Sequence, residues 1–426
     1  MNAPADIDDL SLMMTTIARD ARRASTALRR AATEQKNAAL KQTAVHIEAS
    51  ADTILAANAI DVANATENGL SAAMVDRLKL DPARLDGIVA ALNDIAALPD
   101  PVGVKISERV RPNGLRIERV RTPIGVIAVI YESRPNVTID AGALCLKSGN
   151  AAILRGGSEA LNTSKALHDQ LQQGLTDAGL PTACVQLVPT ADRAAVGMIL
   201  GGLNGDVDLI IPRGGKSLVA RVQAEARAPV LSHLDGLCHV YVDKDADIEK
   251  AVAITVNAKM RRTGVCGAAE TLLIDEARLS EFLPPIAAAL RDAGCHLKAD
   301  ARCRAVDPSL EEAAEPDFET EYLDAVLSVA AVHGVGGAVD HIATYSSGHT
   351  ETIITENDVA ASKFLNDVDS AIVMHNASTQ FADGGEFGLG AEIGIATGRL
   401  HARGPVGLEE LTTYKNVVHG VDHVRD

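Results

Sequence analysis

The sequence predicts an α/β protein built around two parallel sheets. Its 426 residues are 47% hydrophobic and 23% charged, which suffices for a sizeable core. From residue 124 onward, short β-branched runs alternate with helical patterns, and a second alternation begins near residue 239. Such alternation implies parallel strands with helices on both faces of each sheet. At about 150 residues per domain, the length allows two to three domains.

The first hundred residues have the periodicity of helices. Apolar side chains recur at steps of three and four residues in one stripe from Leu10 to Leu28 and in a second from Leu40 to Ile54. We expect the second helix to end near Gly69. Asp81-Pro82 combines an N-cap with a proline at the first helical position, so a third helix begins there and ends at Pro99-Asp100-Pro101.

Residues 106–121 differ from both flanks because charged and apolar residues are mixed on either side of Asn113-Gly114. Asn-Gly is a strong hairpin signal. The predicted ribbon is too charged on both faces to belong to a core. We therefore expect a projecting arm that contacts a partner subunit.

Two groups of elements follow the arm. The expected strands of the first group are 124–131, 151–154, 185–188 and 207–211, with helices at 135–147, 159–174, 191–201 and 215–226. The expected strands of the second group are 239–242, 271–274, 325–331 and 371–374, with helices at 246–260 and 277–293. The stretch 296–320 is expected to be a loop.

Composition excludes several classes of protein. The net charge of −17 and an aromatic content of 2% argue against a nucleic-acid binder. The longest apolar run, Ile124–Tyr131, is too short for a membrane helix, and the N-terminus lacks the pattern of a secretory signal. Six cysteines without paired spacing form no disulfide framework, and Cys295, Cys303 and His296 are only a weak metal pattern. We expect a soluble, cytoplasmic protein without a metal.

Two glycine-rich turns share one design. Arg155-Gly156-Gly157-Ser158 and Arg213-Gly214-Gly215-Lys216 each follow a predicted strand and open a predicted helix. Such a turn presents free N–H groups and the positive end of the helix dipole to a phosphate, although glycine also simply permits a tight turn. Two such turns in one sheet favour a dinucleotide site. A P-loop is excluded because Ile210 occupies the position of its first glycine.

Cys266 is the most informative cysteine because glycines at 264 and 267 leave its sulfur open to a cleft. Lys259, Arg261 and Arg262 are close in sequence, and cations stabilise a thiolate. The alternative is an ordinary loop cysteine. Asn136 either donates its amide N–H to a developing oxyanion or caps a helix. His233 and Asp235 are either a general base with its carboxylate partner or a pair with a purely structural role.

Seven segments resemble the aldehyde dehydrogenase superfamily and, within it, the γ-glutamyl phosphate reductase family. They are residues 123–136 (PIGVIAVIYESRPN), 150–157 (NAAILRGG), 211–215 (IPRGG), 233–236 (HLDG), 264–266 (GVC), 386–394 (EFGLGAEIG) and 407–409 (GLE). The resemblance covers essentially the whole chain, and YESRPN and IPRGG are specific to the reductases.

The resemblance implies three domains and a reaction. The cofactor-binding domain would comprise 1–105, 124–230 and 356–392, the catalytic domain 231–355, and a small β oligomerisation flap 106–123 and 393–426. The family reduces γ-glutamyl phosphate to glutamate 5-semialdehyde and phosphate with NADPH, through a cysteine thioester, in the second step of proline biosynthesis. A homo-oligomer and an association with the upstream glutamate kinase are also implied.

The resemblance further assigns roles to residues. Cys266 takes the place of the nucleophile and Asn136 that of the oxyanion-hole amide. Apart from the resemblance, four basic residues are candidates for the substrate phosphate or carboxylate, because guanidinium pairs with both; a solvated surface is the alternative for at least two of them. His233 stands where aldehyde-oxidising members carry the Glu that activates water, and Gly267 where many reductases carry Asn. The implied cofactor-binding residues are Arg155, Gly156, Gly157, Ser158, Arg213, Gly214, Gly215 and Glu321. The basic residues are Arg134, Lys259, Arg261 and Arg262.

Two rival functions remain open. An aldehyde-oxidising or CoA-acylating dehydrogenase of the same fold would turn over without phosphate. A non-catalytic scaffold would bind nucleotide without turnover. The missing Glu counts against the oxidising form, and the retained Cys266 and Asn136 count against the scaffold.

Overall fold

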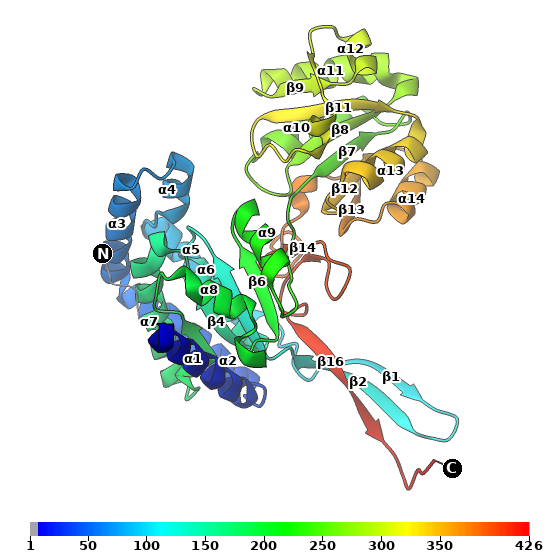
Figure 1. Cartoon of the computed structure of the whole chain (residues 1–426). Coiled ribbons are helices and arrows are strands. Elements are labelled where there is room, and N and C mark those ends of the chain that lie inside the picture. Colours follow the sequence, from blue (N-terminus) through cyan, green and yellow to red (C-terminus); the bar gives the residue numbers. More distant parts are fainter. Residues whose placement is uncertain (1–6, 426) are drawn as a thin grey trace. The chain divides into compact units, whose positions relative to one another are not determined.

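A computed structural model of the chain describes residues 7–425 (Figure 1). The chain divides into two compact units. The described residues of unit 1 are 7–232, 388–394 and 406–425, and unit 2 comprises 233–387 and 395–405. Each unit contains one parallel sheet, which confirms the predicted fold class. The expectation that no secretory signal is present concerns residues 1–6, which lie outside the described part.

The sheet of unit 1 has four parallel strands in the order β5-β4-β3-β6. Its strands are β3 (Val126–Tyr131), β4 (Ala151–Arg155), β5 (Val185–Leu187) and β6 (Leu209–Arg213). Val129 of β3 pairs with Leu154 on one side and Ile211 on the other. Every residue of β3 and β4 is buried, as expected for strands covered on both faces.

The described residues of unit 1 form nine α-helices. They are α1 (Ile7–Leu28), α2 (Thr33–Ala49), α3 (Ala51–Glu67), α4 (Ala72–Leu78), α5 (Pro82–Ala97), α6 (Val137–Lys147), α7 (Leu161–Asp177), α8 (Arg193–Leu200) and α9 (Lys216–Glu225). Leu10 and Met14 of α1 are buried against alternate residues of β3 and β4, together with α8 and α9. The predicted single helix after residue 40 is wrong, because Ser50 separates α2 from α3. As predicted, Asp81 caps α5 by accepting a hydrogen bond from Arg84 N.

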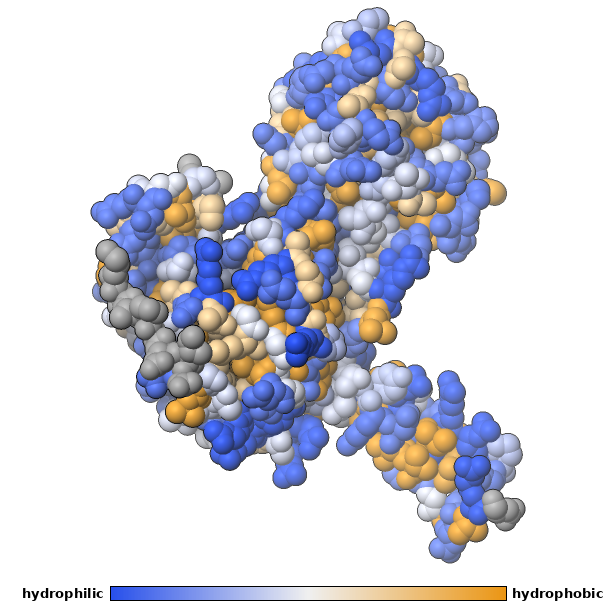
Figure 2. Space-filling model, in the orientation of Figure 1, coloured by the Kyte–Doolittle hydropathy of each residue, from blue (hydrophilic) through white to orange (hydrophobic). Residues whose placement is uncertain are grey.

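A separate antiparallel sheet forms an arm of unit 1, and it contains the predicted hairpin at Asn113-Gly114 (Figure 1). Its order is β1 (Lys105–Val110), β2 (Arg116–Pro123) and β16 (Thr412–His419). Every residue of β1 is exposed. Apolar atoms nevertheless gather on the arm, as Figure 2 shows, and Ile106, Val110 and Val418 are among the exposed large hydrophobic residues.

The sheet of unit 2 has seven parallel strands in the order β10-β9-β11-β8-β7-β12-β13. The strands are β7 (Cys238–Val242), β8 (Ala269–Asp275), β9 (His296–Ala299), β10 (Glu311–Glu312), β11 (Val326–Val332), β12 (Thr350–Ile354) and β13 (Ile372–His375). A short antiparallel pair, β14 (Ile395–Ala396) and β15 (Gly404–Pro405), also belongs to this unit.

Helices cover both faces of the second sheet. They are α10 (Ile248–Met260), α11 (Leu279–Asp292) and α12 (Ala301–Val306) on one face and α13 (Gly334–Tyr345) and α14 (Asp358–Asp367) on the other. Val240 and Leu272 face the first group, whereas the neighbouring Tyr241 and Leu273 face the second. This alternation is the period of two that a strand imposes on its side chains.

The structure corrects three expectations for unit 2. Residues 296–320 are not a loop, since they contain β9, α12 and β10. The sequence reading also omitted β12, α13 and α14. Residues 356–387 and 395–405 belong to unit 2, whereas the expected boundaries gave them to the cofactor-binding domain and the flap. The physical reason is strand pairing, because Thr350 of β12 pairs with Ile372 of β13, which extends the sheet of unit 2.

No helix in residues 7–425 has both the length and the apolar character needed to cross a membrane.

Candidate active site

The site residues predicted in unit 2 lie at the amino edge of its sheet. Cys266 precedes β8, Glu321 precedes β11, and His233 precedes β7. His349, which the sequence reading missed, immediately precedes β12. Because these strands are parallel neighbours, their amino ends meet at one edge of the sheet.

The loop that carries Cys266 is held by close backbone contacts. Cys266 is half-buried, and its carbonyl oxygen accepts a hydrogen bond from Cys238 Sγ at 3.1 Å. A Cβ atom on Gly236 would lie 2.2 Å from the Cys266 carbonyl oxygen and 2.7 Å from its Cα. Only glycine at 236 lets the two backbones approach this closely. Gly267 is similar, since a Cβ there would lie 3.0 Å from Thr379 O.

Glu321 lies beside the same glycine. Its Oε1 accepts a hydrogen bond from Gly236 N at 2.9 Å, so Glu321 and the backbone of Cys266 both lie beside Gly236. The structure therefore brings the Glu321 carboxylate and the backbone of Cys266 to the same glycine, although the two residues are far apart in the sequence.

Lys259 has a different environment from the one expected for a substrate-binding residue. Its side chain is fully buried, and Nζ lies 2.6 Å from Glu270 Oε2, which is also buried. Burial raises the pKa of Glu270 to about 7, against the opposing effect of Lys259. The ammonium neutralises this carboxylate and is not available to a substrate anion. Lys259 lies in the last turn of α10 and Glu270 is the second residue of β8, so the ion pair joins the two ends of the Cys266 loop.

The two arginines that follow Lys259 are exposed at the start of this loop. Arg261 Nη1 lies 3.4 Å from Gln380 Oε1, and the Arg262 carbonyl accepts a hydrogen bond from Gln380 Nε2 at 3.2 Å. Their guanidinium groups reach solvent from the chain segment that leads to Cys266.

The glycine turns of unit 1 follow the carboxyl ends of β4 and β6, whereas the predicted site residues of unit 2 precede the amino ends of their strands. Gly215, which has no side chain to act as a cap, is the N-cap of α9. Gly215 N donates to Glu132 Oε2 at 2.9 Å. A Cβ on Gly214 would lie 2.5 Å from the same oxygen. Arg213 forms an ion pair with Glu392 at 3.8 Å.

The first turn is similarly tight. A Cβ on Gly156 would lie 3.1 Å from the ring of Tyr131, and one on Gly157 would lie 2.2 Å from Glu159 Oε1. Ser158 is exposed. Arg155 is buried and donates from Nη1 to Gly156 O at 2.9 Å and from Nη2 to Ala191 O at 3.0 Å, while Nε has no partner.

Asn136 does not cap a helix, although it occupies the N-cap position of α6. Its backbone is helical, and Nδ2 donates instead to Asp140 Oδ2 at 2.8 Å. Burial raises the pKa of Asp140 to about 6. The alternative reading of Asn136 as a cap is therefore wrong. Asn136 and Arg134 lie in unit 1, and Cys266 lies in unit 2.

The carboxyl edge of unit 1 fits a dinucleotide phosphate. The helix α9 begins there at a glycine, and buried Arg155 Nε has no hydrogen-bond partner. Both features suit an anionic group placed against backbone N–H groups. One residue must move, because Glu132 already accepts the Gly215 N–H that a phosphate would use.

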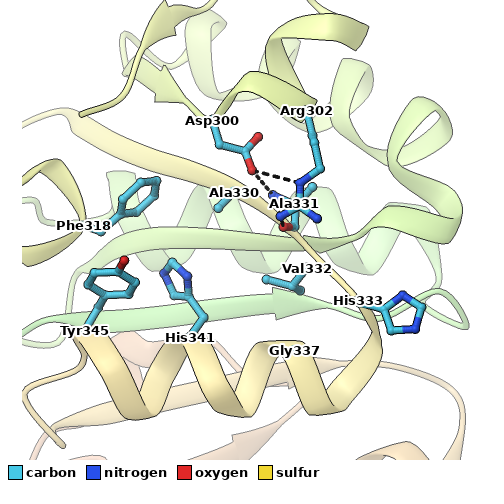
Figure 3. Close-up of a pocket in the computed structure, with 10 residues that line it drawn as sticks. All are labelled: Asp300, Arg302, Phe318, Ala330, Ala331, Val332, His333, Gly337, His341 and Tyr345. Carbon is cyan, nitrogen blue, oxygen red and sulfur yellow. Dashed lines mark hydrogen bonds and ion pairs between the residues drawn. The ribbon is translucent and has the colours of Figure 1, made fainter. Parts of the chain in front are cut away.

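A cavity of about 310 Å³ lies elsewhere in unit 2, beside the carboxyl end of β11 (Figure 3). Arg302 spans it, with Nε 3.5 Å from Asp300 Oδ2 and Nη2 bonded to Ala331 O. His341 also lines the cavity, and burial lowers its pKa to about 3. No predicted site residue lines this cavity.

Comparison with known proteins identifies close relatives. The model of the aldehyde dehydrogenase family matches residues 13–304. A gamma-glutamyl phosphate reductase from Parvibaculum lavamentivorans is 59% identical over 421 residues, covering 99% of this chain and 99% of the relative. One from Caulobacter vibrioides is 62% identical over 412 residues, covering 97% and 100%. A crystal structure of gamma-glutamyl phosphate reductase from Thermotoga maritima superimposes with a TM-score of 0.95 at 46% identity, covering 97% of this chain and 100% of that one.

Proposed function

Because the chain belongs to the γ-glutamyl phosphate reductases of the aldehyde dehydrogenase family, we propose that it reduces γ-glutamyl phosphate to glutamate 5-semialdehyde and phosphate. NADPH supplies the hydride in this proposal, and the product serves proline biosynthesis. The observation that carries the proposal is the half-buried Cys266, held against Gly236 on a loop that also adjoins Glu321.

Cys266 is the proposed nucleophile. Its thiolate attacks the γ-acyl carbon, the C–O bond to phosphate breaks, and phosphate leaves with that electron pair. The resulting thioester accepts hydride at its carbonyl carbon. The tetrahedral thiohemiacetal then expels the thiolate, which restores Cys266 and releases the aldehyde. The departing phosphate takes up one proton from solvent in each turnover, and no water molecule is consumed.

His233 supports this reaction rather than aldehyde oxidation. An oxidising enzyme hydrolyses its thioester with water activated by a Glu, and the resemblance places His233 at that position. The His233 Nδ1 atom lies 2.8 Å from Ile395 O, so this nitrogen is occupied by a structural hydrogen bond. Without that Glu, the proposed thioester lacks the base that an oxidising enzyme uses for hydrolysis, which favours hydride transfer.

Residues of both units have proposed roles in binding. The turns at 155–158 and 213–215 hold the nucleotide phosphates, with Arg155 beside the adenosine ribose, and Glu321 holds the nicotinamide ribose. Asn136 Nδ2 and the Cys266 N–H stabilise the oxyanion. Arg134, Arg261 and Arg262 are the remaining proposed partners for the substrate phosphate and carboxylate, since guanidinium pairs with both in a bidentate manner.

The arm of unit 1 is the proposed subunit contact of a homo-oligomer. Ile106, Val110 and Val418 are exposed on its strands. Apolar residues on a thin, two-sided ribbon gain a partner when another copy covers them.

The test runs the reaction backward, because the acyl phosphate is labile. Purified protein is mixed with glutamate 5-semialdehyde and NADP⁺, and NADPH is followed with and without inorganic phosphate. Formation of NADPH that requires phosphate supports the proposal. NADPH formation that does not depend on phosphate would indicate an aldehyde-oxidising enzyme. NADPH formation that requires CoA would indicate an acylating enzyme. Nucleotide binding without turnover means a scaffold.

A further inference from the structure

Two histidines of unit 2 lie next to Cys266. One ring nitrogen of His233, one of His349 and the sulfur of Cys266 lie within 4.8 Å of one another. The two imidazole rings meet edge to face, with centroids 5.0 Å apart. The proposed reaction gives neither ring a chemical step. Three side chains with nitrogen and sulfur donors converge on one point at the amino edge of the sheet.

The hydrogen bonds of these rings leave the same nitrogen available in each. His233 Nδ1 lies 2.8 Å from Ile395 O. A carbonyl oxygen only accepts, so Nδ1 carries the proton and Nε2 of the neutral ring carries a lone pair. His349 Nδ1 lies 2.9 Å from Thr350 Oγ1 and 3.5 Å from Cys238 Sγ. Metal-binding histidines characteristically have their second nitrogen held in this way.

His349 supplies an independent observation. Its side chain is completely buried, with 0% exposed, and its Nε2 has no hydrogen-bond partner. Buried polar atoms nearly always have partners, and an exception calls for an explanation such as an ion. A cation bound between His349 Nε2, His233 Nε2 and Cys266 Sγ would provide the missing partner.

We propose that Cys266, His233 and His349 form a three-ligand site for a thiophilic divalent cation of the Zn²⁺ class, which blocks the nucleophile while it is bound. The inference rests on the proposed function, since the block matters only if Cys266 is the nucleophile. On binding, the Cys266 thiol releases its proton to solvent, and the thiolate and two neutral imidazoles donate their lone pairs. Thiolate and imidazole select zinc-like ions, whereas Mg²⁺ and Ca²⁺ need oxygen ligands.

The geometry is close to that of a zinc centre. Zinc–nitrogen and zinc–sulfur bonds place tetrahedral ligand atoms about 3.3–3.6 Å apart, with the fourth position left to a water molecule. The present separations of up to 4.8 Å therefore require only a small closure. Glycines at 264 and 267 flank Cys266 in the loop that would move.

The direct test uses Co²⁺ as a spectroscopic probe of the full-length, reduced, metal-free protein. Binding at this site produces a thiolate-to-cobalt charge-transfer band in the near ultraviolet at one equivalent, and Zn²⁺ displaces the probe. We expect Cys266→Ser to lose the band, and His233→Ala and His349→Gln to weaken binding at least tenfold. His296→Ala, an exposed histidine beside Cys295, is the matched control and keeps native binding.

The outcomes of these experiments distinguish a failure of the proposed metal site from a failure of the proposed function. Native protein without the band, or histidine variants that bind cobalt as tightly as native protein, would overturn the proposed site. His233 is half-buried, so its variant remains informative if His349→Gln does not fold. Enzyme with phosphate-dependent turnover is expected to lose that turnover in Zn²⁺ and regain it with a chelator. A band in a protein without such turnover would keep the site and refute the proposed function.

Discussion

The two parallel sheets carry their candidate functional residues at opposite edges. In unit 1 the proposed nucleotide site lies at the carboxyl ends of the strands, where Gly156 and Gly214 follow β4 and β6. In unit 2 Cys266, Glu321 and His349 lie at the amino ends. Helices begin at a carboxyl edge, so backbone N–H groups can bind phosphate there. Helices end at an amino edge, so the chemistry of unit 2 has to come from side chains and close backbone packing.

The largest effect expected at the amino edge comes from breaking its buried ion pair. Lys259→Met leaves the Glu270 carboxylate buried without its partner and should lower the free energy of unfolding by about 3–5 kcal/mol. Denaturant unfolding measures this. The double variant Lys259→Met/Glu270→Leu should recover much of the loss. A single variant as stable as native protein would show that the pair does not hold the Cys266 loop.

Gly236 tests the backbone contact at the same edge. Gly236→Ala places a Cβ atom where Cys266 O lies and should displace the nucleophile by about 1 Å, lowering kcat roughly 10²-fold. Steady-state kinetics and thermal unfolding measure the two consequences. Gly336→Ala in α13 is the control because its Cβ meets no atom within 4 Å. Equal kinetics for both variants would contradict the account.

A smaller effect is expected at the carboxyl edge of unit 1. Gly214→Ala brings a Cβ within 2.5 Å of the flexible Glu132 carboxylate and should weaken nucleotide binding about tenfold, or 1.4 kcal/mol. Titration of nucleotide fluorescence measures the dissociation constant. Gly197→Ala, with open space around its Cβ, should bind as native protein does. A lower kcat with unchanged nucleotide affinity would show that this turn does not bind the nucleotide, contrary to the proposal.

The smallest effect concerns the carboxyl edge of unit 2, which we consider structural. Burial holds the pKa of His341 at about 3, below its ordinary value of 6.5. The unfolded chain therefore takes up a proton below about pH 6.5 that the folded chain does not, and stability is lost as the pH falls. His341→Gln should reduce this loss between pH 7 and pH 5.5 by about 1 kcal/mol. Urea unfolding of the native protein and the variant at both pH values measures this difference. An equal change in the free energy of unfolding between the two pH values for both proteins would refute the prediction.

The sequence predicted the parts of the fold that follow simple periodicity. The stripe from Leu10 to Leu28 is a buried helix face, and β3 and β4 are continuous apolar runs. The strand β12 escaped prediction because Thr350, Glu351 and Thr352 are polar yet fully buried. Glu351 tolerates burial since it accepts hydrogen bonds from His239 and from the hydroxyls of Ser346 and Ser370. His239 is 112 residues away in the sequence, so the pairing that satisfies this carboxylate could not be predicted locally.

The candidate site, like the fold, could be predicted only where the signal is local in the sequence. The spacing of glycines around Cys266 and in the two turns was visible in the sequence, and so was the proposed role of each. The burial of Lys259 was not, because its partner Glu270 lies beyond the loop. His349 also gave no local signal. Its closeness to Cys266 arises only when β8 and β12 flank β7 in the sheet.

The most direct test of this division between the edges is Cys266→Ala, assayed twice. NADPH binding is followed by nucleotide fluorescence, and phosphate-dependent formation of NADPH is followed in the reverse reaction. We predict nucleotide affinity within about twofold of native protein and turnover reduced by at least about 10³-fold, since the covalent step is removed and the phosphate-binding turns are untouched. Turnover close to native would contradict the central claim that the amino edge of unit 2 carries the chemistry.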